Sequence, residues 1–181
     1  MCRLGAEYHA AAVAAFMAEF PYLVDAPAEE HPALAGCEDV AWADLHGCHA
    51  HVPVLLRGLL DADAAPEAER CLVNLAFASP FAVGEVMAPL LPFWLRVAAD
   101  VDAPARIRLA GTLALTAEYV RDDDSALPWD STEQQRRDEA ACRGAFAADA
   151  EWVRRLLDDA ALCAEAGLTL RDVAALSAVA A

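Results

Sequence analysis

The sequence contains no lysine: all 13 basic residues are arginine, set against 29 aspartates and glutamates, and the net charge is −16. An acidic surface repels phosphate backbones, which argues against ordinary DNA or RNA binding. The same charge suits a basic partner, a cation or simple solubility. The absence of lysine, together with abundant alanine, suggests GC-rich coding, which says nothing about function.

The chain also lacks a run of about 18 apolar residues, so no membrane-spanning segment is predicted. Its first residues, with one arginine followed by Glu7, do not read as a signal peptide. The six cysteines are widely spaced and include no Cys-x-x-Cys pair. These features predict a cytoplasmic protein with reduced, mostly buried thiols.

Strand-forming residues are scarce as well. Valine, isoleucine and threonine never alternate with polar residues over the length of a strand. Alanine, which has the highest helix propensity, makes up about a quarter of the chain. The predicted fold class is therefore all-α, and 181 residues fit a single domain.

Two stretches of the sequence match each other: "VPVLLRGLLDADAAPEAERCLVNLAF" from Val52 and "LPFWLRVAADVDAPARIRLAGTLAL" from Leu91. The matching positions are Pro53, Leu56, Arg57, Asp61, Asp63, Pro66, Arg70, Leu75 and Ala76 with Pro92, Leu95, Arg96, Asp100, Asp102, Pro104, Arg108, Leu113 and Ala114. A helix, an Asp-rich turn, a proline and a second helix recurring at this period indicate a helical solenoid. Asp63 and Asp102 are predicted to cap the second helix of each unit.

The remaining segments are arranged around these two units. Residues 1–36 are predicted to form an N-terminal helix and loop, residues 38–120 the two clear repeats, residues 121–131 an acidic loop, and residues 132–181 a divergent repeat with a C-terminal cap. Capping boxes are expected at Ser131 with Gln134 and at Thr169 with Asp172. One continuous helix is expected from about Glu151 to Ala166, and Gly167 ends it.

A family resemblance follows from these motifs. The "W-x-x-L" of Trp42 and Leu45 leads into "VPVLLRGLL", and "APEAERCLVNL", "GEVMAPLLPFWLRVAAD" and "APARIRLAGTLAL" follow. In these stretches the chain resembles bacterial HEAT-like repeat proteins over roughly residues 38–120, with a weaker echo over 140–160. The resemblance implies an α-solenoid of about two and a half helical hairpins with capping helices. Most such solenoids bind proteins, while a minority are enzymes.

Arg57 and Arg96 occupy equivalent positions in the two units. The resemblance implies that their helices line the concave face. There, with Trp94 nearby and Trp129 in the acidic loop, they are predicted to bind a partner, since arginine and tryptophan are enriched at interface hot spots. The alternative is that both arginines pair with acids of their own turns.

Residues 46–51 read "HGCHAH", at a place where family patterns often carry a Tyr-Gly pair and an acidic residue. His46, Cys48, His49 and His51 are candidate ligands of zinc or copper, and the three histidines are also candidate catalytic groups. Asp44 and Glu85 are further candidate catalytic acids. The alternative is a polar turn with Cys48 as a small buried filler, and no cofactor is expected in that case.

The sequence therefore predicts a non-catalytic scaffold that binds a protein or peptide. Its charge favours a basic partner, and immunity-type masking of a basic toxin is one concrete form. The alternative is a small enzyme of specialised metabolism that holds a small molecule near the His46–His51 turn. Neither hypothesis involves nucleic acid or a membrane.

Overall fold

The computed structural model describes residues 3–26, 31–45, 48–80, 82–121 and 132–181, with side chains from residue 7 onward. These ranges are mostly helical with almost no strand, which confirms the all-α prediction. The α-helices are α1 (Arg3–Glu19), α2 (Val52–Gly58), α3 (Ala65–Ala76), α4 (Met87–Ala98), α5 (Arg106–Val120), α6 (Glu133–Ala148), α7 (Ala150–Asp158), α8 (Ala160–Glu165) and α9 (Leu170–Val179). Short 3-10 helices are η1 (Pro21–Leu23), η3 (Pro32–Leu34) and η4 (Trp42–Asp44), and the strands are β1 (Phe77–Ser79) and β2 (Ala82–Val83).

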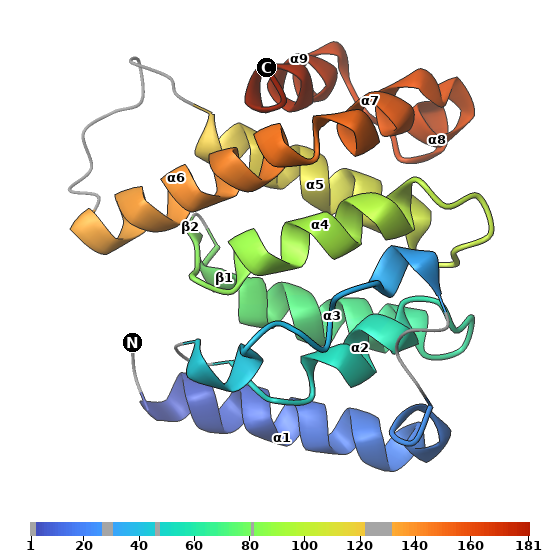
Figure 1. Ribbon diagram of the computed structural model, residues 1–181, viewed down its shortest axis with the longest axis vertical. Coiled ribbons are helices and arrows are strands. Elements are labelled where there is room, and N and C mark those ends of the chain that lie inside the picture. Colours follow the sequence, from blue (N-terminus) through green and yellow to red (C-terminus); the bar gives the residue numbers. More distant parts are fainter. Residues whose placement is uncertain (1–2, 27–30, 46–47, 81, 122–131) are drawn as a thin grey trace.

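The helices lie above one another in the order of the sequence (Figure 1). Helix α1 is at one end, followed by α2 with α3, then α4 with α5, and finally α6 to α9. Helix α2 packs against α3 and α4 against α5, while α6 contacts both α4 and α5 and α9 packs on α5. One cluster of buried apolar side chains extends through the stack, from Val13 in α1 to Val179 in α9.

The two matched units form helical hairpins with equivalent turns. In the first, Asp61 Oδ1 accepts hydrogen bonds from the backbone N–H of Asp63 at 3.0 Å and of Ala64 at 2.9 Å. In the second, Asp100 Oδ1 accepts one from the N–H of Asp102 at 3.1 Å. The predicted capping roles of Asp63 and Asp102 are therefore wrong. An aspartate side chain bonds most readily to the N–H two residues further on, so the first aspartate holds each turn.

The two units differ at their first helices. Pro53 lies in the first turn of α2, as predicted, where its missing N–H leaves no hydrogen bond unmade. The equivalent Pro92 lies inside α4, which begins at Met87. A short antiparallel hairpin, β1 with β2, precedes α4 and was not predicted. Strands this short carry no alternating pattern by which a sequence would reveal them.

The C-terminal helices confirm one prediction and correct another. Thr169 and Asp172 form the expected capping box at the start of α9. The expected single helix over 151–166 is broken at Asp159, whose side chain accepts a hydrogen bond from Leu162 N at 2.9 Å and caps α8. Its other oxygen pairs with Arg106 Nη2 at 2.6 Å. Ser131 lies outside the described residues, and Thr132 caps α6 by accepting from Gln135 N.

Among the described residues, no helix combines the length and the apolar character that crossing a bilayer requires. The largest fully buried side chains include Trp94, Phe16 and Phe146, which come from three different tiers of the stack. Their burial ties the first helix, the second hairpin and α6 to the same core.

Candidate functional site

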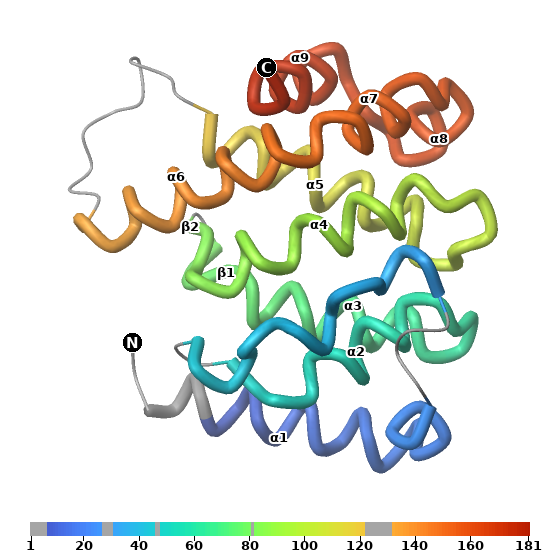
Figure 2. Tube along the Cα trace, viewed as in Figure 1, coloured from blue at the N-terminus to red at the C-terminus, as the bar shows by residue number. Residues whose placement is uncertain are grey.

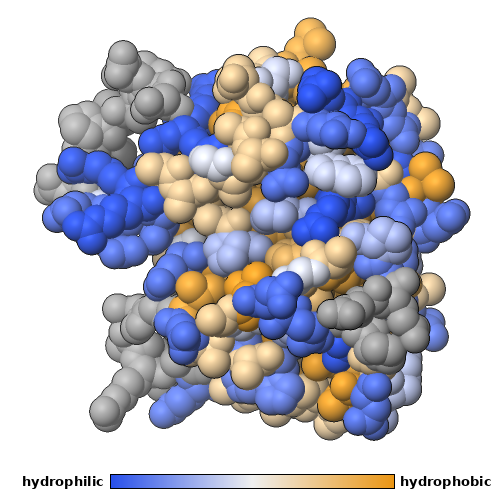
Figure 3. All heavy atoms as spheres, viewed as in Figure 1, coloured by the Kyte–Doolittle hydropathy of each residue, from blue (hydrophilic) through white to orange (hydrophobic). Residues whose placement is uncertain are grey.

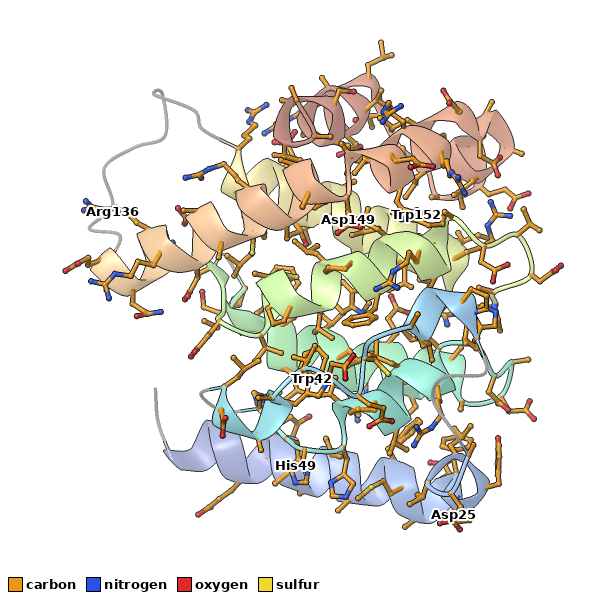
Figure 4. The ribbon with its side chains drawn as sticks, in the orientation of Figure 1. Asp25, Trp42, His49, Arg136, Asp149 and Trp152 are labelled. Atoms are coloured by element: carbon orange, nitrogen blue, oxygen red, sulfur yellow. The ribbon has the colours of Figure 1, made fainter. Side chains whose placement is uncertain are left out.

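The chain between α1 and α2 covers the face on which partner binding was predicted. We call residues 21–26 and 31–45 the connecting segment; it runs across α2 and α4 (Figure 2). Trp42 anchors it: the indole is buried, its ring centroid lies 6.0 Å from that of Phe93 in α4, and its Nε1 donates to Cys37 O at 2.8 Å (Figure 4). The chain itself thus occupies this surface.

Arg57 and Arg96 hold the connecting segment in place. Arg57 donates from Nε to Leu23 O at 2.8 Å and from Nη2 to Val24 O at 3.3 Å, and its side chain is only 10% exposed. Arg96 donates from Nη1 to Ala35 O at 3.0 Å and from Nε to Pro92 O at 2.9 Å. Arg57 and Arg96, which occupy equivalent positions in the two units, therefore both donate hydrogen bonds to carbonyls of the connecting segment.

Two predictions were open for these arginines: a partner-binding strip, or ion pairs with acids of their own turns. Neither matches this arrangement. Arg57 pairs with Glu38 rather than with an acid of its own turn, and Asp100 pairs with His31 at 3.1 Å. Trp94 is fully buried, so its indole offers no surface to a partner. Trp129, the remaining residue of the predicted strip, lies outside the described residues.

The histidine turn brings two of its candidates into direct contact. His49 is labelled in Figure 4. Its Nδ1 lies 2.8 Å from His51 Nδ1, with ring centroids separated by 4.9 Å and planes inclined by 35°. Such a pair is a hydrogen bond only when one ring donates to the other. Burial, and then the proximity of His51, lower the pKa of His49, which favours its neutral form.

The other members of the turn contribute differently. Burial raises the pKa of the half-buried Cys48 thiol to about 11, so without a metal ion it is protonated at neutral pH and is not a ready nucleophile. His46 lies outside the described residues, and Asp44 is exposed in η4. Within the described part of the chain, no group of three or more His, Cys, Asp or Glu side chains is arranged to hold a metal ion.

A pocket of about 540 Å³ lies on another face of the molecule. Its walls are His9 of α1, Leu75 of α3, the β1–β2 hairpin with the turn after it, and the first turns of α6. In the space-filling view the outline is indented below the hydrophilic start of α6 (Figure 3). Glu85, a candidate from the sequence, lines this pocket; its charge also acts on Cys48, so the pocket lies near the histidine turn.

Gly84 shapes the hairpin that forms one wall. Its N–H donates to Ala76 O at 2.7 Å, and a Cβ at this position would lie 3.2 Å from the same oxygen. A side chain here would push the strand away from α3, so glycine permits the close approach. At the hairpin turn, Tyr119 of α5 donates its hydroxyl to Pro80 O at 3.0 Å. These contacts fix the position of Glu85 directly after Gly84.

The polar side chains of the pocket come from α1, from the hairpin with the turn after it, and from α6. Asp138 of α6 accepts from Gln134 Nε2 at 2.9 Å. Burial raises the pKa of Asp138, the Gln134 hydrogen bond opposes the rise, and the negative charge of Glu85 adds to it. His9 Nδ1 is buried with no hydrogen-bond partner, and burial lowers the pKa of this ring. A neutral imidazole offers one unprotonated nitrogen as an acceptor.

Comparison of this chain with protein-family models, with curated proteins and with solved structures finds no match. The site therefore rests on its own geometry. The sequence singled out Glu85 as a candidate catalytic acid, and it did not single out His9 or Asp138 as members of this pocket. No motif links α1, the hairpin and α6, because the tertiary fold alone brings them together.

Proposed function

We propose that this chain is a HEAT-like helical-repeat binding module that recognises a partner protein through the pocket between the β1–β2 hairpin and the start of α6. The observation that carries this is the pocket itself, which combines an apolar wall with polar side chains from three separate elements. Pockets that combine apolar walls with a few convergent polar groups are the usual binding sites of proteins. The equivalent turns at Asp61 and Asp100 support the repeat assignment.

We place partner binding at the pocket rather than at the predicted concave strip, because the connecting segment covers the strip. A partner on the Arg57–Arg96 side would have to displace the connecting segment and break its hydrogen bonds. The pocket requires no such displacement. The net charge of −16 favours a basic partner, and masking of a basic toxin remains one concrete form of the proposal.

A displayed library of random peptides, selected against the immobilised chain, tests the proposal. Ala78 is exposed on the pocket wall, so Ala78→Trp fills the pocket at little cost to the core. Ala161→Trp places the same bulk on exposed α8, away from the pocket, and serves as the matched control. We expect peptides that bind the original chain and the control variant but not Ala78→Trp. Equal binding to all three, or no enriched peptide, contradicts the proposal.

One observation favours a second candidate, a small enzyme. A neutral His9 and an Asp138 of raised pKa in one pocket are the kind of pair that performs general acid–base catalysis. If the chain is an enzyme, a screen for small molecules that raise its melting temperature should find compounds that the original chain converts into a product. Asp138→Asn should then abolish turnover while leaving binding in place. If mass spectrometry detects no product from any small molecule that binds, the enzyme hypothesis is excluded and the binding module remains.

A further inference from the structure

We propose that the exposed sides of α1, α3, α5 and α9 form one face, the outer face, which binds a second copy of this chain as a two-fold dimer. Figure 1 shows these four helices in this order from one end of the stack to the other. The inference goes beyond the proposed function, because it concerns a different surface and a different partner and does not depend on the pocket beside α6.

Contacts between neighbouring helices make the outer face one continuous surface. Helix α1 packs against α3, and α9 packs against α5. Between α3 and α5, Arg108 pairs with Glu69. Arg171 of α9 pairs with Glu118 of α5 at 2.7 Å. Side chains of successive helices therefore meet along the whole face.

Exposed apolar side chains gather on the outer face. Seven large apolar or aromatic side chains are exposed in the described part of the chain, and four of them belong to α1, α5 and α9. These four are Tyr8, Ile107, Leu115 and Leu170, which are 57%, 39%, 46% and 90% exposed. Apolar side chains grouped on the surface of a protein mark sites of interaction with other molecules.

A hollow of about 370 Å³ opens on the same face. Its largely apolar walls come from α3, α5, the β1–β2 hairpin and His9 of α1, and they include Val73, Phe77 and Leu115. Tyr8, the neighbour of His9 in sequence, is exposed beside this hollow. The face thus carries a projecting side chain and a hollow large enough to receive one. A two-fold contact requires such self-complementarity, because both copies present the same surface.

The charge of α3 and α5 permits the approach of a second acidic copy. Two chains with a net charge of −16 repel each other, so they come together only where the local charge is balanced. Helix α3 contains two glutamates and one arginine, and α5 contains one glutamate and two arginines, so their charges cancel. A basic partner gains nothing from a balanced surface. The three glutamates are all paired: Glu67 with Arg70, Glu69 with Arg108, and Glu118 with Arg171.

The outer face is large enough for a stable dimer. Its helices are 10 to 17 residues long. At 1.5 Å per residue and about 9 Å between packed helices, four such helices present roughly 700 Å². Specific protein–protein contacts bury about 800 Å² on each partner, so a dimer would use most of this face.

Sedimentation velocity of the full chain over a concentration series tests the inference. We expect the mass to rise from 19.2 kDa to twice that value between about 1 μM and about 100 μM. The dimer should dissociate less in about 0.5 M than in about 0.05 M sodium chloride, because salt screens the repulsion between two acidic copies. A chain that stays monomeric throughout overturns the inference and leaves the outer face to a partner of another sequence. A dimer that salt weakens also overturns it.

Two variants with the same change of charge localise the contact. Leu115→Glu places a carboxylate at the hollow and should raise the dimer dissociation constant at least about tenfold, because the charge would be buried without a partner. Val101→Glu, in the exposed turn before α5, should leave the constant unchanged. Equal effects of the two variants overturn the inference.

Hydroxyl-radical footprinting of the original chain gives a readout that does not depend on how a variant folds. Tyr8 and Leu115 should be oxidised less at high than at low protein concentration, because the second copy covers them. Tyr22 is exposed on the connecting segment and should be oxidised equally at both concentrations. Protection confined to residues outside the outer face contradicts the proposed contact.

Discussion

At the scale of single residues, Gly58 marks the closest approach of α1 to the first hairpin. A Cβ built on it would lie 2.6 Å from Phe16 Cζ and 2.8 Å from Ala68 Cβ. Both neighbours are fully buried, so neither can move without disturbing the core. On either side of this glycine, Arg57 holds the connecting segment and Leu59 is fully buried in the core, so the C-terminal end of α2 is constrained.

Gly58→Ala should therefore destabilise the fold by about 1–3 kcal/mol, the usual cost of overpacking a core. Gly111→Ala in α5 is the matched control, because nothing lies within 4 Å of its Cβ and alanine is the better helix former. That variant should gain up to about 1 kcal/mol. Denaturant unfolding of both variants measures the difference. Similar effects of the two substitutions would show that α1 does not pack against Gly58 in solution.

His9 predicts a pH dependence of stability. Burial lowers its pKa from 6.5 in the folded state, so the unfolded chain takes up the proton first as pH falls. Stability is therefore full above 6.5 and declines as pH drops through the window between 6.5 and the lower folded pKa. His9→Gln should flatten this decline in unfolding measurements over the same range. An unchanged slope would mean that other groups account for the acid sensitivity.

The hypothesis that the turn at His49 and His51 binds zinc or copper stays a prediction. Their Nδ1 atoms, 2.8 Å apart, can share a proton or lie together on one transition-metal ion. The hypothesis predicts stoichiometric heat when zinc or copper is titrated into the chain. A His49→Ala/His51→Ala variant should abolish that heat. If the variant and the original chain release equal heat, the pair is an ordinary hydrogen bond.

At the scale of secondary structure, the connecting segment contains only short 3-10 helices and turns, yet it covers two α-helices. Its carbonyls accept from Arg57 and Arg96, and its indole at Trp42 packs beside Phe93. Hydrogen bonds to a charged group contribute more than neutral ones, about 1.5–3 kcal/mol. The segment is thus fixed by a few strong contacts rather than by a ladder of backbone bonds.

Arg57→Met should release this segment while keeping the apolar stem in place. Backbone amides within residues 21–26, whose carbonyls Arg57 holds, should then exchange with deuterium about tenfold faster, because local opening costs less free energy. Exchange in α5 should not change. Arg154→Met, on an exposed position of α7, is the control and should leave both regions as they are. Unaltered exchange in residues 21–26 would show that the Arg57 contacts do not hold this part of the segment.

The elements differ in how far the sequence reveals them. The helical hairpins and the Thr169–Asp172 cap follow from local signals, namely apolar spacing, proline and short-range hydrogen bonds. The break at Asp159 was missed because Arg106, distant in sequence, supplies its second partner. The arginines were assigned to a surface because their acceptors, such as Leu23 O and Ala35 O, are backbone atoms that no sequence pattern marks.

At the scale of the whole molecule, charge connects stability with recognition. A net charge of −16 on 181 residues makes the folded chain repel itself, and the same potential attracts a basic partner from a distance. The more exposed ion pairs among the described residues, such as Arg70 with Glu67 and Arg155 with Glu151, contribute little. Self-repulsion is therefore the larger salt-dependent term in folding.

Salt should consequently act in opposite directions on folding and on binding. Raising sodium chloride from about 0.05 M to about 0.5 M shortens the screening length several-fold. The melting temperature should rise, because self-repulsion is screened, while affinity for basic peptides selected against the chain should fall steeply, mainly through slower association. Thermal unfolding and surface-based kinetics on the same preparation measure both. A matched peptide with neutral residues in place of its basic ones should show little change. An affinity that does not change with salt would mean that binding depends on shape and apolar contacts rather than on charge.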